Sequence, residues 1–304
     1  MNAVQKFGFN ADSLVVSFEK FLDVMPATVK AYKSGLKTFI KYVNIEGIKT
    51  PNAETVLNFK RDLQARGRKP STINLYLSAV KRFFNWTAQK NLYPNVALGV
   101  KGVKTDKGFK KDFFIGSQIK KILAGFDTST LEGMRNYVIF ALMSTCGLRT
   151  IEVARAKISD LSTIGGVPVL YVRGKGRTDA KDFVKLCPQV QQALNSYLKM
   201  RDNADKTNAL FTSCSDRNYG QNLTRVTIST ICKKAMRQAG FNSNRLTAHS
   251  LRHTAVTLAL MNGQSLEEVQ AFARHSNINT TMVYNHAINR INSMCEISIA
   301  KEIF

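Results

Sequence analysis

A stretch rich in Gly and Lys near residue 100 constrains the fold of this chain more than any other feature. Residues 95–112 read NVALGVKGVKTDKGFKKD, and no apolar periodicity persists through them. Such a segment is expected to run extended as a positively charged linker. The 304 residues of the chain are enough for two domains. We therefore predict a helical domain over residues 1–96, a basic linker over 97–112, and a second domain with a C-terminal tail over 113–304.

The sequence before the linker predicts a small bundle of four helices. Residues 11–24 carry apolar side chains at the spacing of one helix face. Three further segments, residues 26–47, 52–67 and 69–94, are bounded by Pro and Gly, which commonly begin and end helices. The short connections between the four segments favour a bundle.

Several residues of this bundle are candidates for contact with a phosphate backbone. For any one of them, a solvated helix face is an equally good explanation. The candidates are Tyr32, Lys33, Lys37, Lys41, Lys81 and Arg82.

After the linker the sequence pattern becomes mixed. A strongly apolar helix is predicted to end at Gly147, and strands at Val169–Val172 and Phe183–Leu186 flank a Gly-rich turn. The remaining segments are helical in pattern. The predicted fold class is therefore mainly α with a small β-hairpin or sheet.

The charge of the chain indicates an anionic partner. Lys and Arg number 44 against 21 Asp and Glu, which gives a formal net charge of +23. Nucleic acid, an acidic membrane surface or an acidic protein can balance such an excess. Because the basic residues recur along helical segments, the pattern favours folded surfaces that follow a phosphate backbone. The alternative is a basic protein whose charge serves only solubility.

The sequence argues against several classes of protein and site. No run of 18 apolar residues occurs, so no membrane span is predicted, and the N-terminal residues lack an apolar core for export. The cysteines form no CxxC pair, which argues against a disulfide framework and a zinc site, and no P-loop is present. We expect a cytoplasmic protein with reduced cysteines and no metal. The cysteines are Cys146, Cys187, Cys214, Cys232 and Cys295.

Two motifs place a cation beside glycines. In CGLRTIEV, Gly147 permits a sharp turn before Arg149, and Glu152 lies on the same helical side, where it can orient the guanidinium. In RGKGRTD, Lys175 lies between two glycines at the predicted tip of the hairpin. An ion pair at a helix end and a solvated turn lysine are the ordinary explanations of these two motifs.

Two further motifs add imidazoles, a second guanidinium and a phenol. AHSLRH places His249 and Arg252 three residues apart, so both lie on one face of the first helix turn. ARHSNINTTMVYNH adds His275 and, nine residues later, Tyr284. A lone His or Tyr is usually structural, but the combination with the two cations above points to a phosphate-binding site.

The two remaining histidines are not expected to act in this site. His253 follows Arg252 and is expected to face another side of the helix and to pack. His286 is expected at the surface near Tyr284.

Four stretches together resemble the tyrosine site-specific recombinases, also called the phage integrase family. They are TCGLRTIEVARAKISDL, VRGKGRTDAKDFVKL, AHSLRHTAVTLAL and FARHSNINTTMVYNH, and they cover most of residues 140–290. The N-terminal helices are similar in layout to the core-binding domain of the family, so the resemblance implies a C-shaped clamp on DNA. The chain has Ala273 and Arg274 where the family often has Leu-Gly, a difference that we expect to carry little weight.

The resemblance implies that the motif residues cleave a DNA strand. Tyr284 would attack a phosphodiester, forming a 3′-phosphotyrosyl bond and releasing a 5′-hydroxyl. Arg149 and Arg252 would bind the non-bridging oxygens and neutralise the charge that grows in the transition state. Because two guanidiniums can supply this positive charge, no metal or other cofactor is expected.

The other motif residues would assist proton transfer and placement of the phosphate. Lys175 would protonate the leaving 5′-oxygen, and His249 would act as general acid and base. His275 would donate a hydrogen bond to the phosphate. Glu152 would support Arg149.

The function implied is that of a site-specific recombinase or integrase of a phage or mobile element, acting on double-stranded DNA with paired recombination sites. The same chemistry serves recombinases that resolve chromosome or plasmid dimers, and nicking and relaxing enzymes of the type IB topoisomerase class. A DNA-binding module without chemistry is a further alternative, against which the complete residue set argues. Accessory DNA-bending or directionality proteins are compatible partners.

The residues after Tyr284 are expected to form a tail. Ile288, Ile291, Met294 and Cys295 are spaced as one helical face. In the family such a tail often packs on a neighbouring subunit, and packing on its own domain is the open alternative. We expect a monomer in free solution and a homotetramer on DNA.

Overall fold

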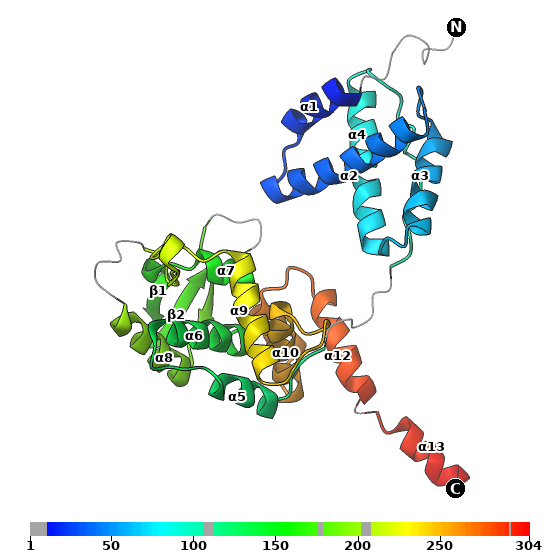
Figure 1. The fold of residues 1–304 in the computed structure, drawn as a ribbon. Helices are drawn as coiled ribbons and strands as arrows, with labels where there is room; N and C mark the ends of the chain where they lie inside the picture. Colours follow the sequence, from blue (N-terminus) through cyan, green and yellow to red (C-terminus); the bar gives the residue numbers. More distant parts are fainter. Residues whose placement is uncertain (1–10, 106–111, 175–178, 202–207, 292) are drawn as a thin grey trace. The chain divides into compact units, whose positions relative to one another are not determined.

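The computed structural model of the chain divides into two compact units, residues 1–107 and 108–304. We call them the N-terminal unit and the C-terminal unit and describe each by itself (Figure 1). The residues that the structure describes are 11–105, 112–174, 179–201, 208–291 and 293–304.

Over its described residues, 11–105, the N-terminal unit is a bundle of four helices, as the sequence predicts. Helices α2 and α4 begin with Pro, whose missing N–H leaves no helix bond unmade at that position. The side chain of Asn52 caps α3 by accepting the backbone N–H of Thr55 at 2.9 Å. The helices are α1 (Ala11–Phe21), α2 (Pro26–Ile45), α3 (Ala53–Ala65) and α4 (Pro70–Gln89).

Aromatic side chains fill the core of this bundle. Phe18, Phe39, Phe59, Phe83 and Phe84 are each at most 1% exposed. Their rings meet edge to face, with centroids 5.2 Å apart for Phe39 and Phe59 and 5.3 Å apart for Phe83 and Phe84. Such pairs add to the free energy gained from burial alone.

The first residues of the expected linker pack on this bundle instead of running free. Ala97 and Val100 are buried in its core. The side chain of Asn74 donates to the carbonyl of Val103 at 2.8 Å and accepts its N–H at 2.7 Å. A Cβ on Gly102 would lie 2.7 Å from Asn74 Oδ1, so glycine allows this close approach. Scattered apolar residues without periodicity were enough to anchor the segment.

The C-terminal unit combines helices with one small sheet. No helix of the described residues is both long and apolar enough to cross a membrane. The helices are α5 (Gly116–Ala124), α6 (Leu131–Thr145), α7 (Thr150–Arg155), α8 (Pro188–Met200), α9 (Arg225–Gln238), α10 (Ala248–Met261), α11 (Leu266–Ala273), α12 (Asn279–Ile291) and α13 (Cys295–Ile303), with short 3₁₀ turns at Ile158–Asp160 and Asp216–Asn218.

The sheet has three antiparallel strands in the order β1-β2-β3, one more than the predicted hairpin. The strands are β1 (Leu161–Ile164), β2 (Val167–Val172) and β3 (Asp182–Lys185). Leu170 of β2 pairs with Leu161 on one side and with Val184 on the other. Most of β1 is exposed, so it lacks the alternation of apolar residues that reveals a strand in sequence.

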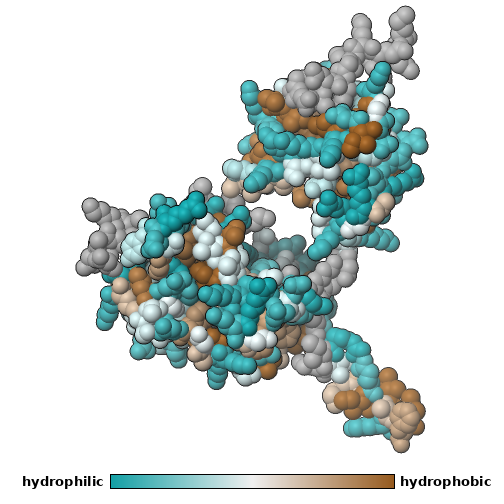
Figure 2. Space-filling view, viewed as in Figure 1, coloured by the Kyte–Doolittle hydropathy of each residue, from teal (hydrophilic) through white to brown (hydrophobic). Residues whose placement is uncertain are grey.

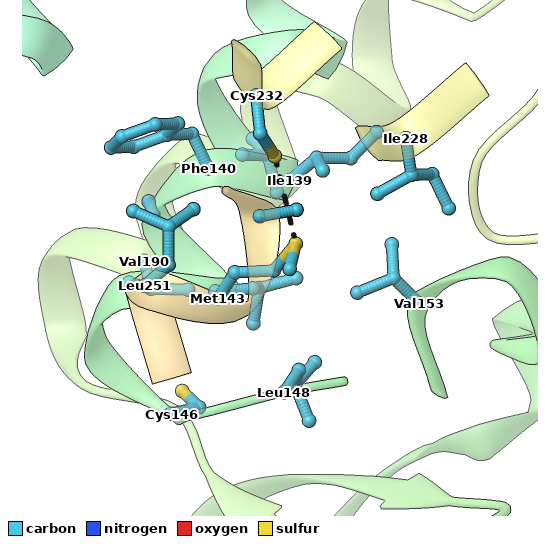
Figure 3. Packing of buried hydrophobic residues seen from close by; sticks show 14 of the residues in the cluster. Ile139, Phe140, Met143, Cys146, Leu148, Val153, Val190, Ile228, Cys232 and Leu251 are labelled. Carbon is cyan, nitrogen blue, oxygen red and sulfur yellow. Dashed lines mark hydrogen bonds between the residues drawn. The ribbon is translucent and has the colours of Figure 1, made fainter. Parts of the chain in front are cut away.

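Helix α6 runs through the core of the C-terminal unit. Its residues Ile139, Phe140 and Met143 are fully buried, and Met143 meets Cys232 of α9, with the two sulfur atoms 3.8 Å apart (Figure 3). A helix that is apolar on nearly all sides must be surrounded in this way. Because α6 is fixed on every side, the turn that follows it is held in place.

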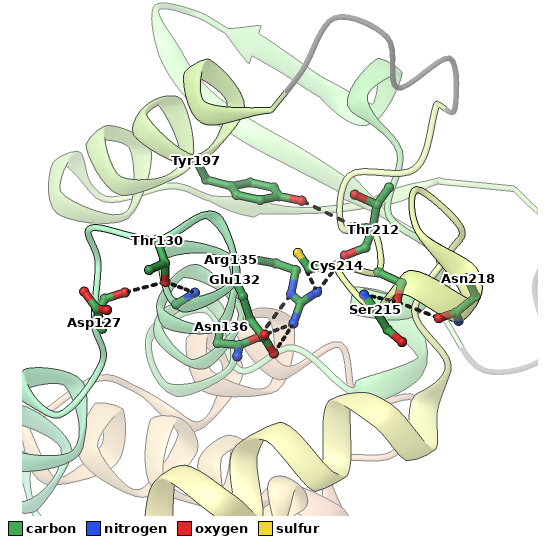
Figure 4. A network of polar contacts seen from close by, with 12 residues as sticks. Asp127, Thr130, Glu132, Arg135, Asn136, Tyr197, Thr212, Cys214, Ser215 and Asn218 are labelled. Atoms are coloured by element: carbon green, nitrogen blue, oxygen red, sulfur yellow. Dashed lines mark hydrogen bonds and ion pairs between the residues drawn. The ribbon is translucent and has the colours of Figure 1, made fainter.

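A buried arginine near the start of α6 ties a distant loop to the same core. Arg135 donates to the carbonyl of Thr212 at 2.9 Å and contacts Cys214, while Glu132 pairs with the guanidinium at 3.2 Å (Figure 4). Tyr197 accepts the N–H of Thr212 at 3.4 Å. The network is structural and lies apart from the predicted catalytic residues in sequence.

The tail forms two helices, not the single apolar face expected from its spacing. Ile288 of α12 is buried, whereas Met294 and Cys295 are exposed at the start of α13. Apolar side chains gather on α13 (Figure 2), where Ile297 and Ile303 are at least half exposed. The expected face is divided because α12 ends at Ile291 and α13 begins anew.

Candidate active site

The turn after α6 places Arg149 at the N-terminus of α7. Gly147 has a φ of +60°, and a Cβ there would lie 3.3 Å from the ring of Phe272, so glycine suits the position on both counts. Glu152 accepts the backbone N–H of Arg149 at 2.8 Å and its Nη1 at 2.7 Å. The carboxylate therefore holds both the main chain and the side chain of Arg149.

Arg252, in the first turns of α10, is almost completely buried. It is 1% exposed, and it donates to the carbonyls of Gly147, at 2.6 Å, and of Ala273. Burial, followed by the charges of Arg149 and Arg274, lowers the pKa of Arg252 to about 9, so it stays protonated at neutral pH. Both partners are neutral oxygens, which leaves a buried positive charge available to an anion.

The C-terminal end of α11 gathers three guanidiniums. The last carbonyls of a helix have no partner within the helix and carry partial negative charge. Here the carbonyl of Phe272 accepts from Arg274 at 2.8 Å, that of Ala273 accepts from Arg252, and that of Arg274 accepts from Arg149 at 3.4 Å. The end of α11 thereby positions cations that come from three separate segments.

Arg274 is a residue whose position the sequence analysis undervalued. Its side chain is only 7% exposed, and its Nη2 pairs with Glu152 Oε2 at 3.0 Å. Arg274 therefore lies inside the arginine cluster, whereas the expectation that it carries little weight stays a prediction. The available signal was its place directly before His275 in the chain.

His275 follows α11 and lies between the arginines and α12. Its Nδ1 is 2.9 Å from the hydroxyl of the buried Thr281. Burial, followed by the positive charges of Arg252, Arg149 and Arg274, lowers its pKa to about 4. The imidazole is therefore neutral at pH 7 and keeps one ring N–H to donate.

Tyr284 is buried in α12 with its hydroxyl bonded to His253 Nδ1. The ring is 5% exposed and packs with Val256 and Val269. Burial raises the pKa of the phenol to about 12, although the charges of Arg252 and Arg149 oppose the shift. The phenol is thus protonated in this structure.

The expectation that His253 only packs is wrong, because it contacts the hydroxyl of Tyr284. His253 lies four residues after His249, so the two rings share one helix face, with centroids 4.5 Å apart. This i, i+4 relation was visible in the sequence. What the sequence did not show was that α12 brings Tyr284 to the same face.

His249 is exposed and lies at the edge of a groove along α9. Basic side chains line this groove, including Arg225, Lys234 and Arg237, together with Thr150 of α7. A groove with this lining fits the phosphates of nucleic acid, and it was not among the predicted DNA-binding positions.

The DNA-binding candidates of the N-terminal unit lie on α2 and α4. Lys37, Lys41 and Arg82 are exposed, and Tyr32, Lys33 and Lys81 are half-buried. Lys33 pairs with Glu19 of α1 at 2.8 Å. Lys37 and Lys41 lie on the same face of α2 and line a groove with Lys33.

The remaining predictions concern Lys175, His286 and the absence of a metal. Lys175 lies outside the described residues, while its neighbour Gly174 lines a hollow with Arg149 and His275. His286 is exposed in α12, as expected. Within the described parts of the chain, no group of three or more His, Cys, Asp or Glu side chains is arranged for a metal ion.

Two parts of the chain match known families. Residues 113–290 match the phage integrase family, and residues 18–91 match the phage integrase N-terminal SAM-like domain. The chain belongs to the phage integrase family. It is a tyrosine recombinase, and the predicted family, fold class and enzyme class are confirmed.

Relatives of this tyrosine recombinase span most of its length. "Tyrosine recombinase XerD" of Listeria monocytogenes serotype 4b (strain F2365) is 26% identical over 269 residues, which cover 85% of this chain and 87% of the relative. "Tyrosine recombinase XerC" of Bacillus pumilus (strain SAFR-032) is 27% identical over 294 residues, covering 91% and 92%. A crystal structure of the XerH site-specific recombinase bound to palindromic difH substrate has a similar fold, with a TM-score of 0.75 at 21% identity, covering 94% of this chain and 85% of that one.

The match to the phage integrase family includes every predicted catalytic residue of this recombinase. All six lie within residues 113–290: Arg149, Lys175, His249, Arg252, His275 and Tyr284. Of the five in the described residues, Arg149 directly precedes α7, His249 and Arg252 lie in α10, His275 follows α11 and Tyr284 lies in α12. The individual roles of these residues are argued below.

Proposed function

We propose that this recombinase exchanges DNA strands at defined pairs of sites, with Tyr284 as the nucleophile. The observation that carries the proposal is the convergence of two guanidiniums, a neutral imidazole and the phenol at the end of α11. The positive charge of Arg252 acts on the phenol of Tyr284. The ring of His275 stacks on that of Tyr284, with the two centroids 6.4 Å apart. This set can bind one phosphate and present an oxygen nucleophile to it.

The cleavage step transfers a phosphoryl group without net loss of bond energy. The oxygen of Tyr284 bonds to phosphorus, the bond from phosphorus to the 5′-oxygen breaks, and the 5′-oxygen takes up a proton from Lys175. The phenolic proton passes to His249, whose ring adjoins the His253 that contacts the phenol. Attack by the 5′-hydroxyl of a partner strand reverses the step and restores Tyr284.

The arginines and His275 supply the field that this step needs. Arg149 and Arg252 bind the two non-bridging oxygens, and their charge stabilises the transition state. His275 donates its ring N–H to the same phosphate. Because the two arginines supply the positive charge and the neutral imidazole supplies a donor, no metal ion or cofactor enters the proposal.

The buried phenol implies that DNA binding changes its surroundings. With a pKa of about 12 and its hydroxyl on His253, Tyr284 is not poised to attack in this structure. A phosphate bound between Arg149 and Arg252 would compete for the site and draw the phenol toward it. We propose that both units clamp the duplex and supply this phosphate.

The partners proposed are double-stranded DNA and further copies of the chain. The exposed apolar residues Ile297, Ile299 and Ile303 of α13 fit a surface on a neighbouring subunit. We propose a monomer in solution and a homotetramer on paired sites. Light scattering with and without site DNA tests this, and a stable tetramer without DNA contradicts it.

The biological setting that we propose is the bacterial cytoplasm. The relatives named XerD and XerC are proteins of bacteria, which supports a bacterial setting. Integration of a phage or mobile element and resolution of chromosome or plasmid dimers use the same chemistry. The choice between them, and the need for accessory DNA-bending or directionality proteins, depends on the sites. Recombination of plasmids with candidate site pairs tests it, and relaxation of plasmids without any such site favours a topoisomerase-like activity.

A suicide substrate tests the chemistry directly. A nick close to the cleavage site lets the short fragment that carries the new 5′-hydroxyl diffuse away after cleavage, which traps the covalent protein–DNA adduct. Wild-type protein should form the adduct on a correct site, and Tyr284→Phe should form none while binding the same duplex with equal affinity. Adduct formation by Tyr284→Phe would show that another residue is the nucleophile.

A further inference from the structure

Glu152 is shared between two guanidiniums. Its Oε1 accepts from Arg149 Nη1 at 2.7 Å, and its Oε2 accepts from the Arg149 backbone at 2.8 Å and from Arg274 Nη2 at 3.0 Å. The Glu152 side chain is fully buried, and that of Arg274 is 93% buried. A buried carboxylate with two cationic partners holds each of them less tightly than it would hold one alone.

The backbone at Arg274 is unfavourable for any residue other than glycine. Its φ of 54° and ψ of 47° lie in the left-handed region, where it ends α11. Among the described non-glycine residues, only Asn91 also has a positive φ, and Asn tolerates this region better than Arg does. The contacts of the Arg274 side chain must therefore compensate for this strain.

Arg274 has a further property that a mere helix cap does not need. Its Nε is buried without a hydrogen-bond partner, so the charged guanidinium lies in the interior with one of its hydrogen bonds unmade. Together with Arg149 and His275 it lines one hollow beside Gly174. The charge of Arg274, more than that of Arg149, keeps the pKa of Glu152 below its ordinary value against the opposing effect of burial.

We propose that Arg274 is a positioning residue, which binds Glu152 so that this carboxylate orients Arg149 without neutralising it. The proposal rests on the proposed function, in which Arg149 binds the scissile phosphate. Arg149, Arg252 and Arg274 carry three positive charges against the one negative charge of Glu152, a sum of +2. Without Arg274 the sum falls to +1, and Glu152 pairs with Arg149 alone.

The chemistry of the contacts separates Arg274 from the catalytic groups. Its two terminal nitrogens bond to Glu152 and to the carbonyls of Phe272 and Gly147. Arg274 is thus paired with a carboxylate, whereas both partners of Arg252 are neutral carbonyls that leave its charge unbalanced. Arg274 acts on the phosphate through Glu152 and Arg149, and does not touch the reacting atoms.

The test measures single-turnover cleavage of the suicide substrate by two variants. Arg274→Gly relieves the backbone strain but also removes the charge and the contacts that compensate for it, so the protein should fold with thermal stability close to that of wild type. We expect its cleavage rate to fall by about 10- to 100-fold, by analogy with the loss seen when partners that orient metal-ligating side chains are removed, with DNA affinity within about twofold of wild type. Arg274→Lys keeps the charge and should recover most of the rate.

A double-mutant cycle distinguishes the electrostatic role from a structural one. In a Glu152→Gln background there is no charge to neutralise, so Arg274→Gly should have a much smaller effect than in wild type. A helix cap that serves only structure would cost the same in both backgrounds. An NMR titration adds a second measurement, because loss of the Arg274 charge should raise the pKa of His275.

The outcomes separate this proposal from the proposed function. If wild-type protein forms no adduct on any site while binding it, the proposed function fails. If wild type cleaves and Arg274→Gly cleaves equally fast, or loses the same factor with Glu152→Gln as without it, the role of Arg274 is refuted and the proposed function stands.

Discussion

The aromatic bundle of the N-terminal unit and the region around the end of α11 bury opposite kinds of side chain. The bundle buries phenylalanines and leaves lysines outside, whereas the second region buries Arg252, Glu152 and most of Arg274. Apolar burial stabilises a fold by itself, but a buried charge costs free energy unless polar groups surround it. Stability and chemistry therefore depend on different parts of this molecule, and substitutions should separate them.

Removing an aromatic ring from the bundle should have the largest effect on stability. Phe39 is fully buried and meets Phe59 and Phe84 edge to face. Phe39→Ala should lower the free energy of unfolding of the bundle by about 3–5 kcal/mol, from lost burial and the cavity left behind. Urea unfolding followed by tryptophan fluorescence measures this loss, because Trp86 lies in the same core.

The same variant tests whether the two regions are independent. At a temperature where Phe39→Ala is folded, and with protein in excess over DNA, its cleavage rate should stay within about twofold of wild type, because the substitution removes no contact within the C-terminal unit. A large fall in rate under these conditions would contradict the separation of stability from chemistry.

Arg252 should show the reverse behaviour, with a large effect on chemistry. Arg252→Lys keeps a positive charge, but an ammonium cannot reach the carbonyls of Gly147 and Ala273 and also bind an oxygen of the phosphate in the same fork geometry. Cleavage should slow by about 10²- to 10³-fold, as on loss of one donor to a transition-state oxyanion. Arg61→Lys, an exposed change in the bundle, is the matched control and should leave cleavage unchanged. A loss below tenfold for Arg252→Lys would remove Arg252 from the transition state.

The bundle could be predicted from the sequence because the apolar periodicity and the residues that begin and end helices indicate the same four segments. Pro26 and Pro70 do begin helices, and the apolar positions between the boundaries do form the core. The order and spacing of the motifs led to the predicted catalytic residues, of which the structure brings Arg252, His275 and Tyr284 close together; their roles stay a prediction. The periodicity of each helix and the spacing within each motif are local properties of the chain, so they can be recognised in the sequence without a structure.

The contacts that sequence reasoning missed are those that tertiary structure creates. His253 meets Tyr284 only because α12 packs on α10, and Arg274 reaches Glu152 only because its backbone adopts a left-handed conformation. Strand β1 was missed because it is mostly exposed and shows no alternation. Several segments together bury a charged side chain, so its burial cannot be predicted from the sequence pattern of one segment.

The depressed pKa of His275 makes the catalytic region sensitive to acid. Its pKa is about 4 in the folded protein and about 6.5 in an unfolded chain. Between these values the unfolded state binds more protons, so stability falls as pH falls from about 6.5 toward 4. From pH 7 to pH 5, wild type should lose about 1–2 kcal/mol more than His275→Gln, after allowance for partial exposure of the ring.

Urea unfolding of both proteins at pH 7 and pH 5 measures this difference. Other groups titrate in the same range, but they are common to both proteins and cancel in the comparison. Equal losses for wild type and His275→Gln would mean that the imidazole is not held neutral by burial and by the arginines.

The smallest effect concerns single lysines on the outside of the bundle, and it sharpens the contrast with the buried arginines. Lys37 is exposed on α2, whereas Lys33 on the same face is paired with Glu19 at 2.8 Å. If α2 follows the phosphate backbone, Lys37→Gln should reduce the slope of log affinity against log salt by about 1, and equally for all DNA sequences. Lys33→Gln should change the slope less, because the charge it removes is already partly neutralised. Fluorescence anisotropy on site and non-site duplexes measures both slopes, and equal slopes for Lys37→Gln and wild type would mean that this face is solvated and does not bind DNA.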